Sequence, residues 1–244
     1  MWVDTNVHLE LMQSDPSLIL ERAKRVSVSV VATGTHPEQW QWLQVQQSSV
    51  KTYGLHPSYA SRRFNPDELI RFLKSDKEAH LGEIGLDYRP EYSDRKRQYL
   101  NFSDQLEIAK QFNRAVIIHS VKAHFDVLKA LKKHAFNRFV VHAFSGSKDI
   151  AMQYLALGGY LSFGGALLAT SPPRVIRCIS EFPATQLLIE TNAPDLAPRN
   201  LTKYEPMHLP LIGEALAKFK NRSVDQLAKQ LRINASNLFN CDFD

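Results

Sequence analysis

The chain has 244 residues, of which 44% are hydrophobic and 23% charged, and its formal net charge is +5. These are ordinary values for a globular protein, and they exclude a disordered or fibrous chain. The modest basic surplus favours an anionic partner but does not by itself indicate nucleic-acid binding.

Cysteine usage and hydropathy indicate the compartment. Cys178 and Cys241 lie far apart and form no CxxC motif, so we expect no disulfide framework and a reducing environment. No apolar run approaches the length of a membrane span, and the first expected strand begins at Trp2, which leaves no room for a signal peptide. We therefore expect a soluble, cytoplasmic monomer that does not bind a membrane.

Short apolar runs recur about every 20–35 residues, with amphipathic or polar stretches between them, a spacing typical of βα units and a parallel sheet. Eight such strands suggest closure into a barrel. The sequence therefore predicts one domain over residues 1–244, an α/β fold of the (β/α)8 or TIM type. The expected strands are Trp2–Asp4, Val26–Ala32, Val50–Leu55, His80–Ile84, Ala115–His119, Phe139–His142, Tyr160–Phe163 and Gln186–Glu190.

Several of the intervening stretches carry helix signals. After Asp94, apolar residues fall at steps of three and four, which is the helical period, and Asp126–Lys133 is a further amphipathic stretch. Ser147 can cap a helix that runs to Leu157 and ends at the following glycines. Ser223 stands at capping-box spacing before another apolar stretch.

Many of the apolar runs end in a side chain that can hold a metal ion. In a parallel barrel the carboxyl ends of the strands share one face, so these side chains should converge. A single buried histidine is more often a satisfied core residue, but two at equivalent strand ends, with a glutamate on a third, favour a metal site. The strand-end residues are Asn6, His8, Glu83, His119, His142 and Asn192.

Motifs along nearly the whole chain resemble the TatD family of metal-dependent deoxyribonucleases, within the amidohydrolase superfamily. The resemblance implies a (β/α)8-type barrel, one or two divalent ions (zinc, magnesium or manganese) and a hydrolytic reaction, usually cleavage of a phosphodiester in DNA. The motifs are Asp4-Thr5-x-x-His8, Gly54-Leu55-His56-Pro57, Gly82-Glu83-Ile84-Gly85-Leu86-Asp87-Tyr88, Gln98-x-x-x-Phe102-x-x-Gln105-Leu106, His119-Ser120, His142-Ala143-Phe144-Ser145-Gly146, Glu190-Thr191-x-Ala193-Pro194 and Glu205-Pro206-x-x-Leu209-Pro210.

The resemblance also implies two ion sites that share Glu83. The second ion would take Glu83, His119 and His142, and two histidines with a carboxylate and an open position form a known hydrolytic zinc set. The first ion would take His8 and Glu83 together with a histidine and an aspartate that this chain replaces by Asn6 and Asn192. An amide oxygen carries no charge, and first-row metals prefer imidazole. We therefore predict metal at the second site, with Asn6 and Asn192 as weak ligands.

The catalytic positions implied by the resemblance are Glu83 and Asn192. A carboxylate at position 192 could accept a proton from the attacking water, but asparagine cannot act as a base at neutral pH. The candidate substitutes are Asp195, Asp87 and Glu190, and the sequence does not place any of them within reach.

The chain departs from the family pattern at one further place, beside the site. Where the family usually has Arg-Asp after the histidine-serine pair of the fifth strand, this chain has Val121-Lys122. A positive group that could face a phosphate has therefore moved or been lost.

The candidate substrate-binding residues have simpler alternatives. His56 precedes Pro57 and falls on a family motif, but a histidine in a turn explains it equally well. Arg62 and Arg63, on a loop expected after the third strand, could meet a nucleic-acid backbone. His124 matches a family histidine on the helix after the fifth strand, and its alternative is a packed residue.

Three functions remain open from the sequence. The first is a metal-dependent hydrolase that cleaves phosphodiester bonds in DNA with weakened activity. The second is a catalytically impaired relative that keeps the barrel as a binding protein, which the two asparagines favour. The third is a metal-dependent hydrolase of an ester or amide outside nucleic acids, because a fold alone does not fix the substrate.

Overall fold

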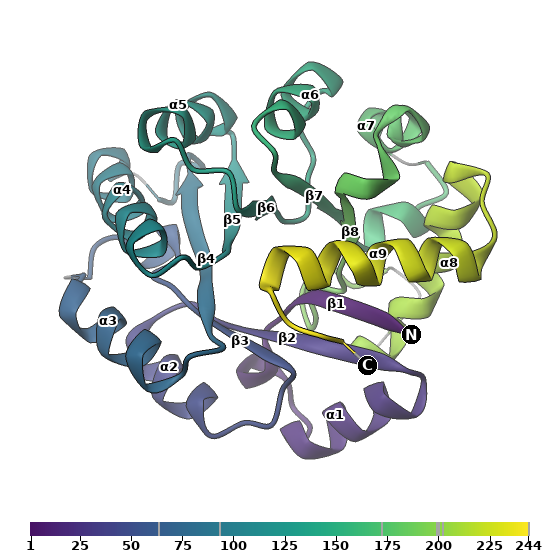
Figure 1. Ribbon diagram of the computed structural model, residues 1–244, viewed down its shortest axis with the longest axis horizontal. Helices are drawn as coiled ribbons and strands as arrows, with labels where there is room; N and C mark the ends of the chain where they lie inside the picture. Colours follow the sequence, from purple (N-terminus) through teal and green to yellow (C-terminus); the bar gives the residue numbers. More distant parts are fainter. Residues whose placement is uncertain (63, 93, 172, 199–200, 202, 244) are drawn as a thin grey trace.

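The computed structural model describes residues 1–62, 64–92, 94–171, 173–198, 201 and 203–243. Its eight strands pair in parallel and in chain order to form one sheet curled into a barrel, with helices around the outside (Figure 1). This confirms the predicted (β/α)8 fold. The strands are β1 (Trp2–Val7), β2 (Val28–Gly34), β3 (Val50–Tyr53), β4 (His80–Asp87), β5 (Val116–Val121), β6 (Phe139–Val141), β7 (Tyr160–Phe163) and β8 (Leu187–Ile189).

The outer helices begin at residues that suit a helix N-terminus. The first three start with proline, whose missing N–H costs no hydrogen bond at that position. The caps predicted at Ser147 and Ser223 accept backbone N–H groups from Ile150 and Gln226, both at 3.3 Å. The helices are α1 (Pro16–Arg25), α2 (Pro37–Gln44), α3 (Pro66–Ser75), α4 (Arg95–Gln111), α5 (His124–His134), α6 (Lys148–Ala156), α7 (Arg174–Arg177), α8 (Leu209–Lys220) and α9 (Val224–Phe239).

Apart from β7, each predicted strand differs from the observed one by one to three residues at an end, and two of these errors have a clear cause. β2 begins at Val28 instead of Val26, because Val26 ends α1 and Ser27 turns the chain with φ 56°. β4 continues past Ile84 to Asp87, because its pairing with β5 extends that far. The longer β4 places Asp87 on the same strand as Glu83.

The register of β1 and of β4 is irregular beside two residues of the expected metal site. The pairing of β1 with β2 shifts between Asp4 and Val7, a span that contains Asn6. The pairing of β4 with β5 shifts between Leu81 and Ile84, a span that contains Glu83. Such bulges re-aim a side chain, and they are common next to active sites.

Side chains join the first strand to the last. Thr5 on β1 donates from Oγ1 to the Ile189 carbonyl of β8 at 3.0 Å. The buried Asp4 carboxylate accepts the Thr191 N–H at 2.9 Å and the Thr191 hydroxyl at 2.6 Å. Burial raises the pKa of Asp4 to about 8, although the bonds from Thr191 oppose the rise. These bonds connect β1 to β8 and the residues after it, and we call this junction of the nearly closed barrel the Asp4–Thr191 seam.

Helix α9 crosses the amino-terminal mouth of the barrel (Figure 1). Its apolar residues enter the layer of side chains that fills this end of the interior. The mouth is therefore sealed, and a site can open only at the opposite, carboxyl-terminal end. This layer contains Val3, Val31, Val50, Ala115, Ile117, Val140, Leu188, Ala235, Leu238, Phe239 and Phe243.

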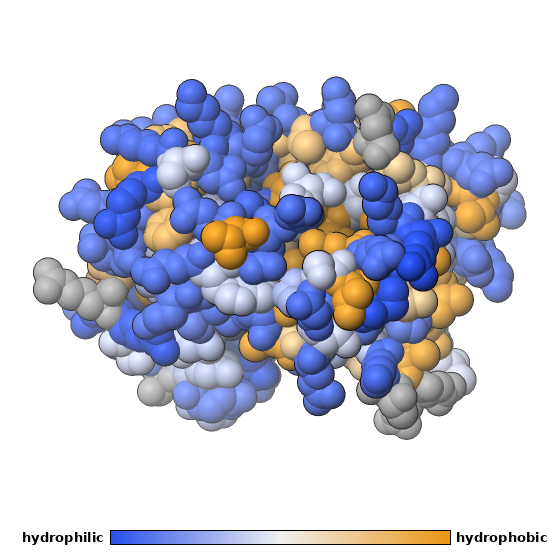
Figure 2. Space-filling model, turned by 90° about the horizontal axis from the view of Figure 1, so that it is seen from below, coloured by the Kyte–Doolittle hydropathy of each residue, from blue (hydrophilic) through white to orange (hydrophobic). Residues whose placement is uncertain are grey.

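The outer helices bury their apolar faces against the barrel. Ile19, Trp40 and Leu69, from α1, α2 and α3, are completely buried. On the face in Figure 2, hydrophilic side chains cover most of the surface and hydrophobic ones emerge between them. Within the described ranges, no helix combines the length and the apolar character that crossing a membrane requires.

Candidate metal centre

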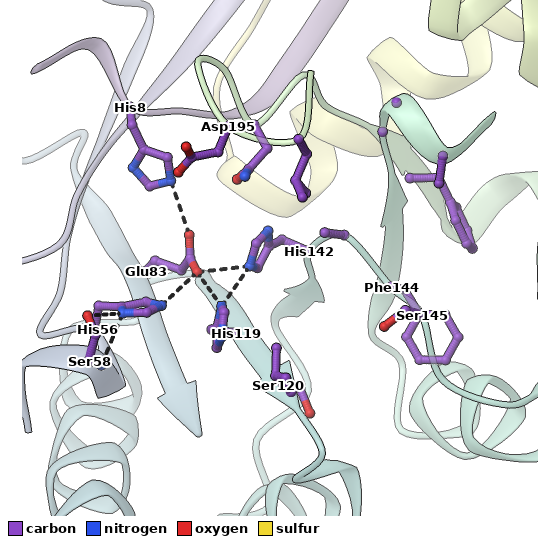
Figure 3. Close-up of a pocket in the computed structure, with 18 of the residues that line it drawn as sticks. His8, His56, Ser58, Glu83, His119, Ser120, His142, Phe144, Ser145 and Asp195 are labelled. Atoms are coloured by element: carbon purple, nitrogen blue, oxygen red, sulfur yellow. Dashed lines mark hydrogen bonds and ion pairs between the residues drawn. The ribbon is translucent and has the colours of Figure 1, made fainter. Parts of the chain in front are cut away.

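Glu83 lies at the centre of a cluster at the carboxyl end of the barrel (Figure 3). Its buried carboxylate oxygen Oε1 is 2.7 Å from His119 Nδ1 and 2.8 Å from His142 Nε2. The two histidine nitrogens are 3.2 Å apart. Ligands bound to one zinc ion at about 2 Å stand about 3 Å from each other. The three atoms therefore have the separations and the chemistry of a cation site.

The other oxygen of Glu83, Oε2, faces a different set of side chains. Asn6 Nδ2 donates to it at 3.1 Å, and His8 Nε2 is 3.4 Å away. Asn192 adjoins this group, with its Oδ1 2.9 Å from Asn6 Nδ2. The structure thus brings together all the strand-end residues that the sequence pattern singled out.

Charges within the cluster oppose the effect of burial. Burial favours the neutral forms, but His142, with bonds from His119, holds the pKa of Glu83 well below its usual range. Burial likewise works to lower the pKa of His142, but Glu83 and Glu190 raise it to about 10. A carboxylate and an imidazolium therefore occupy the ion-free cluster, and an ion that binds there must displace a proton.

The two histidines are each oriented by a second carboxylate. His142 Nδ1 is 3.1 Å from Glu190 Oε1, which also accepts the Ala143 N–H at 2.9 Å. His119 Nε2 is 3.0 Å from Asp87 Oδ2. A carboxylate on the far nitrogen fixes the ring and makes it a better ligand. Asp87 and Glu190 therefore contact the histidines and do not face the cavity as free bases.

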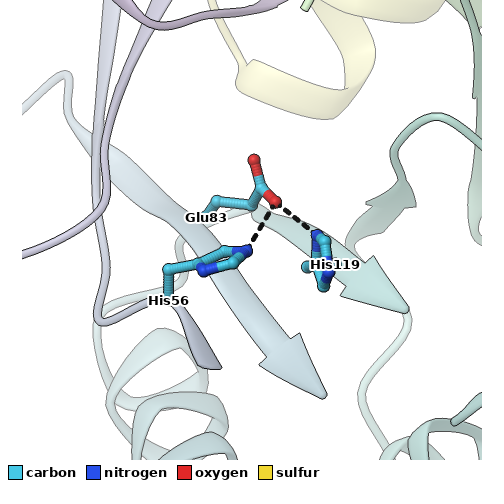
Figure 4. Close-up of side chains that lie close together, drawn as sticks. All are labelled: His56, Glu83 and His119. Atoms are coloured by element: carbon cyan, nitrogen blue, oxygen red, sulfur yellow. Dashed lines mark hydrogen bonds and ion pairs between the residues drawn. The ribbon is translucent and has the colours of Figure 1, made fainter. Parts of the chain in front are cut away.

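His56 lies beside Glu83 and His119 and could be taken for a further ligand (Figure 4). One ligand atom from each of the three lies within 4.8 Å of the others. However, His56 Nδ1 accepts the Ser58 N–H at 3.2 Å, so the proton of the neutral ring sits on Nε2. Burial and the charge of His119 lower the pKa of His56 to about 4, which keeps the ring neutral. His56 Nε2, 3.3 Å from Glu83 Oε1, is therefore a donor.

A cavity of about 700 Å³ opens over the cluster. Tyr59, Arg89 and Tyr92 contribute a polar wall, in which the Arg89 guanidinium stacks on Tyr92 at 5.2 Å. Sequence reasoning missed Arg89, although it directly follows the Asp87-Tyr88 motif. A second part of the lining is largely apolar and includes Phe163, Ala166, Pro173, Val175, Ile176 and Leu196.

The other predicted substrate residues lie farther from the cluster. Arg62 stacks on the cavity residue Tyr59 at 4.8 Å and pairs with Glu38 at 2.7 Å. His124 packs behind the site, with its Nδ1 2.8 Å from Ser120 Oγ and 3.2 Å from the Tyr154 hydroxyl. Neither Arg62 nor His124 is among the described residues that line the cavity. Arg63 lies outside the described residues.

Asp195, on the segment after β8, points into the cavity beside His8 (Figure 3). It is exposed, and in the described part of the chain it forms neither a hydrogen bond nor an ion pair. Glu83, the other carboxylate that lines the cavity, is held by its histidine and asparagine neighbours. Asp195 is thus the cavity carboxylate that is available to a substrate.

Comparison with known proteins gives a consistent family. A family model described as "TatD related DNase" matches residues 3–240. The chain is 30% identical to "Uncharacterized metal-dependent hydrolase YabD" of Bacillus subtilis, over 98% of this chain and 99% of that protein. It is also 30% identical to "3'-5' ssDNA/RNA exonuclease TatD" of Erwinia tasmaniensis, over 97% and 99%. The crystal structure of YjjV, a TatD homolog from Escherichia coli, superposes with a TM-score of 0.92 at 27% identity, over 98% of each chain.

Proposed function

The chain belongs to the TatD family of metal-dependent hydrolases, and we propose that it cleaves phosphodiester bonds in DNA with one divalent ion. The triangle of Glu83 Oε1, His119 Nδ1 and His142 Nε2, with sides of 2.7–3.2 Å, carries this proposal. Two histidines and a carboxylate suit zinc, and magnesium or manganese are the alternatives. The exonuclease name of the Erwinia tasmaniensis relative supports a nucleic-acid substrate.

The roles of the residues follow from their contacts. When bound, a divalent ion supplies Lewis acidity toward the phosphoryl group and the attacking water. Asp87 and Glu190 hold the rings of His119 and His142 in place. His56 offers its Nε2–H to a substrate oxygen in place of Glu83, at a fixed position and without a charge of its own.

A proton acceptor is needed because Asn192 cannot be one. We assign this role to Asp195, which lines the cavity and has no other bond among the described residues. The attacking water would give a proton to the Asp195 carboxylate while the water oxygen bonds to phosphorus. The bond between phosphorus and the leaving oxygen would break in the same step. Asn192 keeps a place at the site through its bond with Asn6.

The proposed activity is weaker than that of a relative with two ions. A positioned acid or base contributes about 10²–10⁴-fold, and Asp195 stands three positions after Asn192, the residue whose role it would take. Loss of a second Lewis acid adds several kcal/mol to the barrier. The substitutions at Asn6 and Asn192 affect both contributions.

DNA cleavage by four proteins tests the proposal: the parent, Asn6→His, Asn192→Asp and the double variant, each with Mg²⁺, Mn²⁺ or Zn²⁺. We expect slow cleavage by the parent, little change in the single variants, and faster cleavage with a second bound ion in the double variant. Parent activity equal to that of an intact relative would show that the asparagines do not weaken the site. A double variant that holds two ions and gains nothing would place the defect elsewhere.

The apolar wall of the cavity supports a second candidate, hydrolysis of a carboxylic ester or amide. Phe163, Val175 and Ile176 would contact an apolar group of such a substrate beside the ion. Assays with p-nitrophenyl esters and bis-p-nitrophenyl phosphate separate the candidates. Metal-dependent cleavage of the carboxylic ester alone would favour the second.

A further inference from the structure

The side chain of Asn6 bridges two oxygens that belong to different strand ends. It is completely buried, and its Nδ2 lies 2.9 Å from Asn192 Oδ1 and 3.1 Å from Glu83 Oε2. An amide nitrogen carries two N–H groups, and these two acceptors use both. His142 Nδ1 also lies 3.2 Å from Asn6 Nδ2, but its own proton is directed to Glu190 Oε1, so it does not accept from Asn6. Asn6 Oδ1 is buried without a hydrogen-bond partner in the described part of the chain.

This bridge stands where the first ion of the family would have to bind. A cation shared by Glu83 Oε2, Asn192 Oδ1 and His8 Nε2 would sit among these three atoms, and Asn6 Nδ2 already contacts both oxygens. An amide nitrogen has no free lone pair and cannot ligate the ion. Turning the amide over would point Asn6 Oδ1 at such an ion, but the ligand set would then hold one carboxylate, one imidazole and two neutral amide oxygens, and both hydrogen bonds of Asn6 would be lost. The residues present are therefore a poor match for a resident ion at this position.

The backbone holds the bridge in register. The Asn192 N–H donates to the Asn6 carbonyl at 3.0 Å, so the two asparagines are joined through both main chain and side chain. Asn192 has φ 57°, a left-handed conformation that asparagine adopts more readily than most residues. This backbone bond keeps the two side chains next to each other.

We propose that Asn6 is a clasp that replaces the first ion of the family. Its two N–H groups hold Glu83 and Asn192 together, as a shared cation would, and the chain carries its ion only at Glu83, His119 and His142. The inference deepens the proposed function and rests on it for the position of the remaining ion. It does not depend on which bond the protein hydrolyses.

Counting ions in the parent protein tests the clasp directly. The full chain is freed of metal with a chelator and titrated with Zn²⁺ by calorimetry, and the bound zinc is measured by elemental analysis. We expect one ion per chain, lost in His119→Ala and retained in His8→Ala. Two ions in the parent, or a single ion that survives His119→Ala and is lost in His8→Ala, would overturn the clasp.

Asn6→Asp provides an independent test that does not require catalysis. The substitution replaces the Nδ2 donor by a carboxylate oxygen, which then faces the acceptor oxygens of Glu83 and Asn192. The metal-free variant should therefore melt roughly 3–10 °C lower than the parent. Zn²⁺ should reverse this loss and raise the zinc content from one to two ions per chain, because the new carboxylate completes a site.

Asn234 supplies a matched control for this variant. It is a buried asparagine whose Nδ2 likewise bridges two oxygens, those of Ala184 at 2.7 Å and Leu187 at 2.8 Å, away from the cluster. Asn234→Asp should also melt lower, but Zn²⁺ should restore nothing beyond its effect on the parent. An Asn6→Asp protein that Zn²⁺ rescues no better than Asn234→Asp would overturn the clasp.

DNA cleavage separates the two proposals. A parent that binds one ion through His119 and cleaves no DNA would end the proposed function and leave the clasp standing. A parent that cleaves DNA with two bound ions would end the clasp and leave DNA cleavage standing, with two ions in place of one.

Discussion

Single nitrogen atoms decide the roles of the histidines around Glu83. His119 presents Nδ1 to the carboxylate because Asp87 holds its Nε2, and His142 presents Nε2 because Glu190 holds its Nδ1. The sequence indicates histidines at strand ends from the apolar runs before them. It cannot indicate which nitrogen faces the site, because that depends on partners from other segments of the chain.

Asp195→Asn should separate proton transfer from metal binding. Removing a general base typically costs about 10²–10⁴-fold, so we expect a loss of that order in kcat with unchanged zinc content. Asp149→Asn, on the surface of α6, is the control and should leave kcat unchanged. If Asp195→Asn cleaves as fast as the parent, another group accepts the proton.

His56→Ala distinguishes a hydrogen-bond donor from a metal ligand. Removing one donor to a developing negative charge costs about 10²–10³-fold in kcat, and we expect such a loss with one ion still bound. His119→Ala, measured in parallel, should lose the ion. Elemental analysis that finds no zinc in His56→Ala would mean that His56 ligates the ion after all.

Strand β4 contributes residues to both ends of the barrel. Its carboxyl end carries Glu83 and Asp87, and its first residue, His80, lies in the sealed mouth. His80 Nδ1 accepts the Ala115 N–H at 3.0 Å, and its Nε2 donates to the Phe239 carbonyl at 2.5 Å. The neutral ring therefore satisfies both contacts and joins β4 to the end of α9. The apolar spacing predicted this strand, but not the contact with a helix that lies more than a hundred residues away in the chain.

Burial lowers the pKa of His80 to about 4, and this makes stability depend on pH. An unfolded histidine titrates near 6.5, so between pH 6.5 and 4 the unfolded chain binds a proton that the folded chain does not. The contribution is fully present above pH 6.5 and is lost as the pH falls toward 4. For this buried ring it amounts to about 3 kcal/mol.

The His80→Gln variant tests this pH dependence, since glutamine keeps one acceptor and one donor. Urea unfolding at pH 7 and pH 5 should show that the parent loses about 2 kcal/mol more than the variant over this interval. His56 titrates similarly in both proteins, so the difference between them isolates His80. Equal losses in the two proteins would contradict the assignment.

In the molecule as a whole, the barrel gathers side chains from position 8 to position 196 around one cavity. The alternation of apolar runs with helical stretches predicted the number and order of the strands. This was possible because the spacing of apolar residues within a strand or helix can be read from that segment alone. The Asp4–Thr191 seam, the two bulges and the place of Asp195 were not predicted. Each depends on contacts between segments far apart in the chain, which no local pattern encodes.

Anomalous diffraction from crystals grown with Zn²⁺ distinguishes one bound ion from two, because it locates each ion. We expect one peak per chain at the catalytic face, about 2.0–2.2 Å from Glu83, His119 and His142. The Asn6 side chain should still bridge Glu83 and Asn192 in the same map. A second peak among His8, Glu83 and Asn192, or a single peak there with none beside His119 and His142, would contradict this expectation.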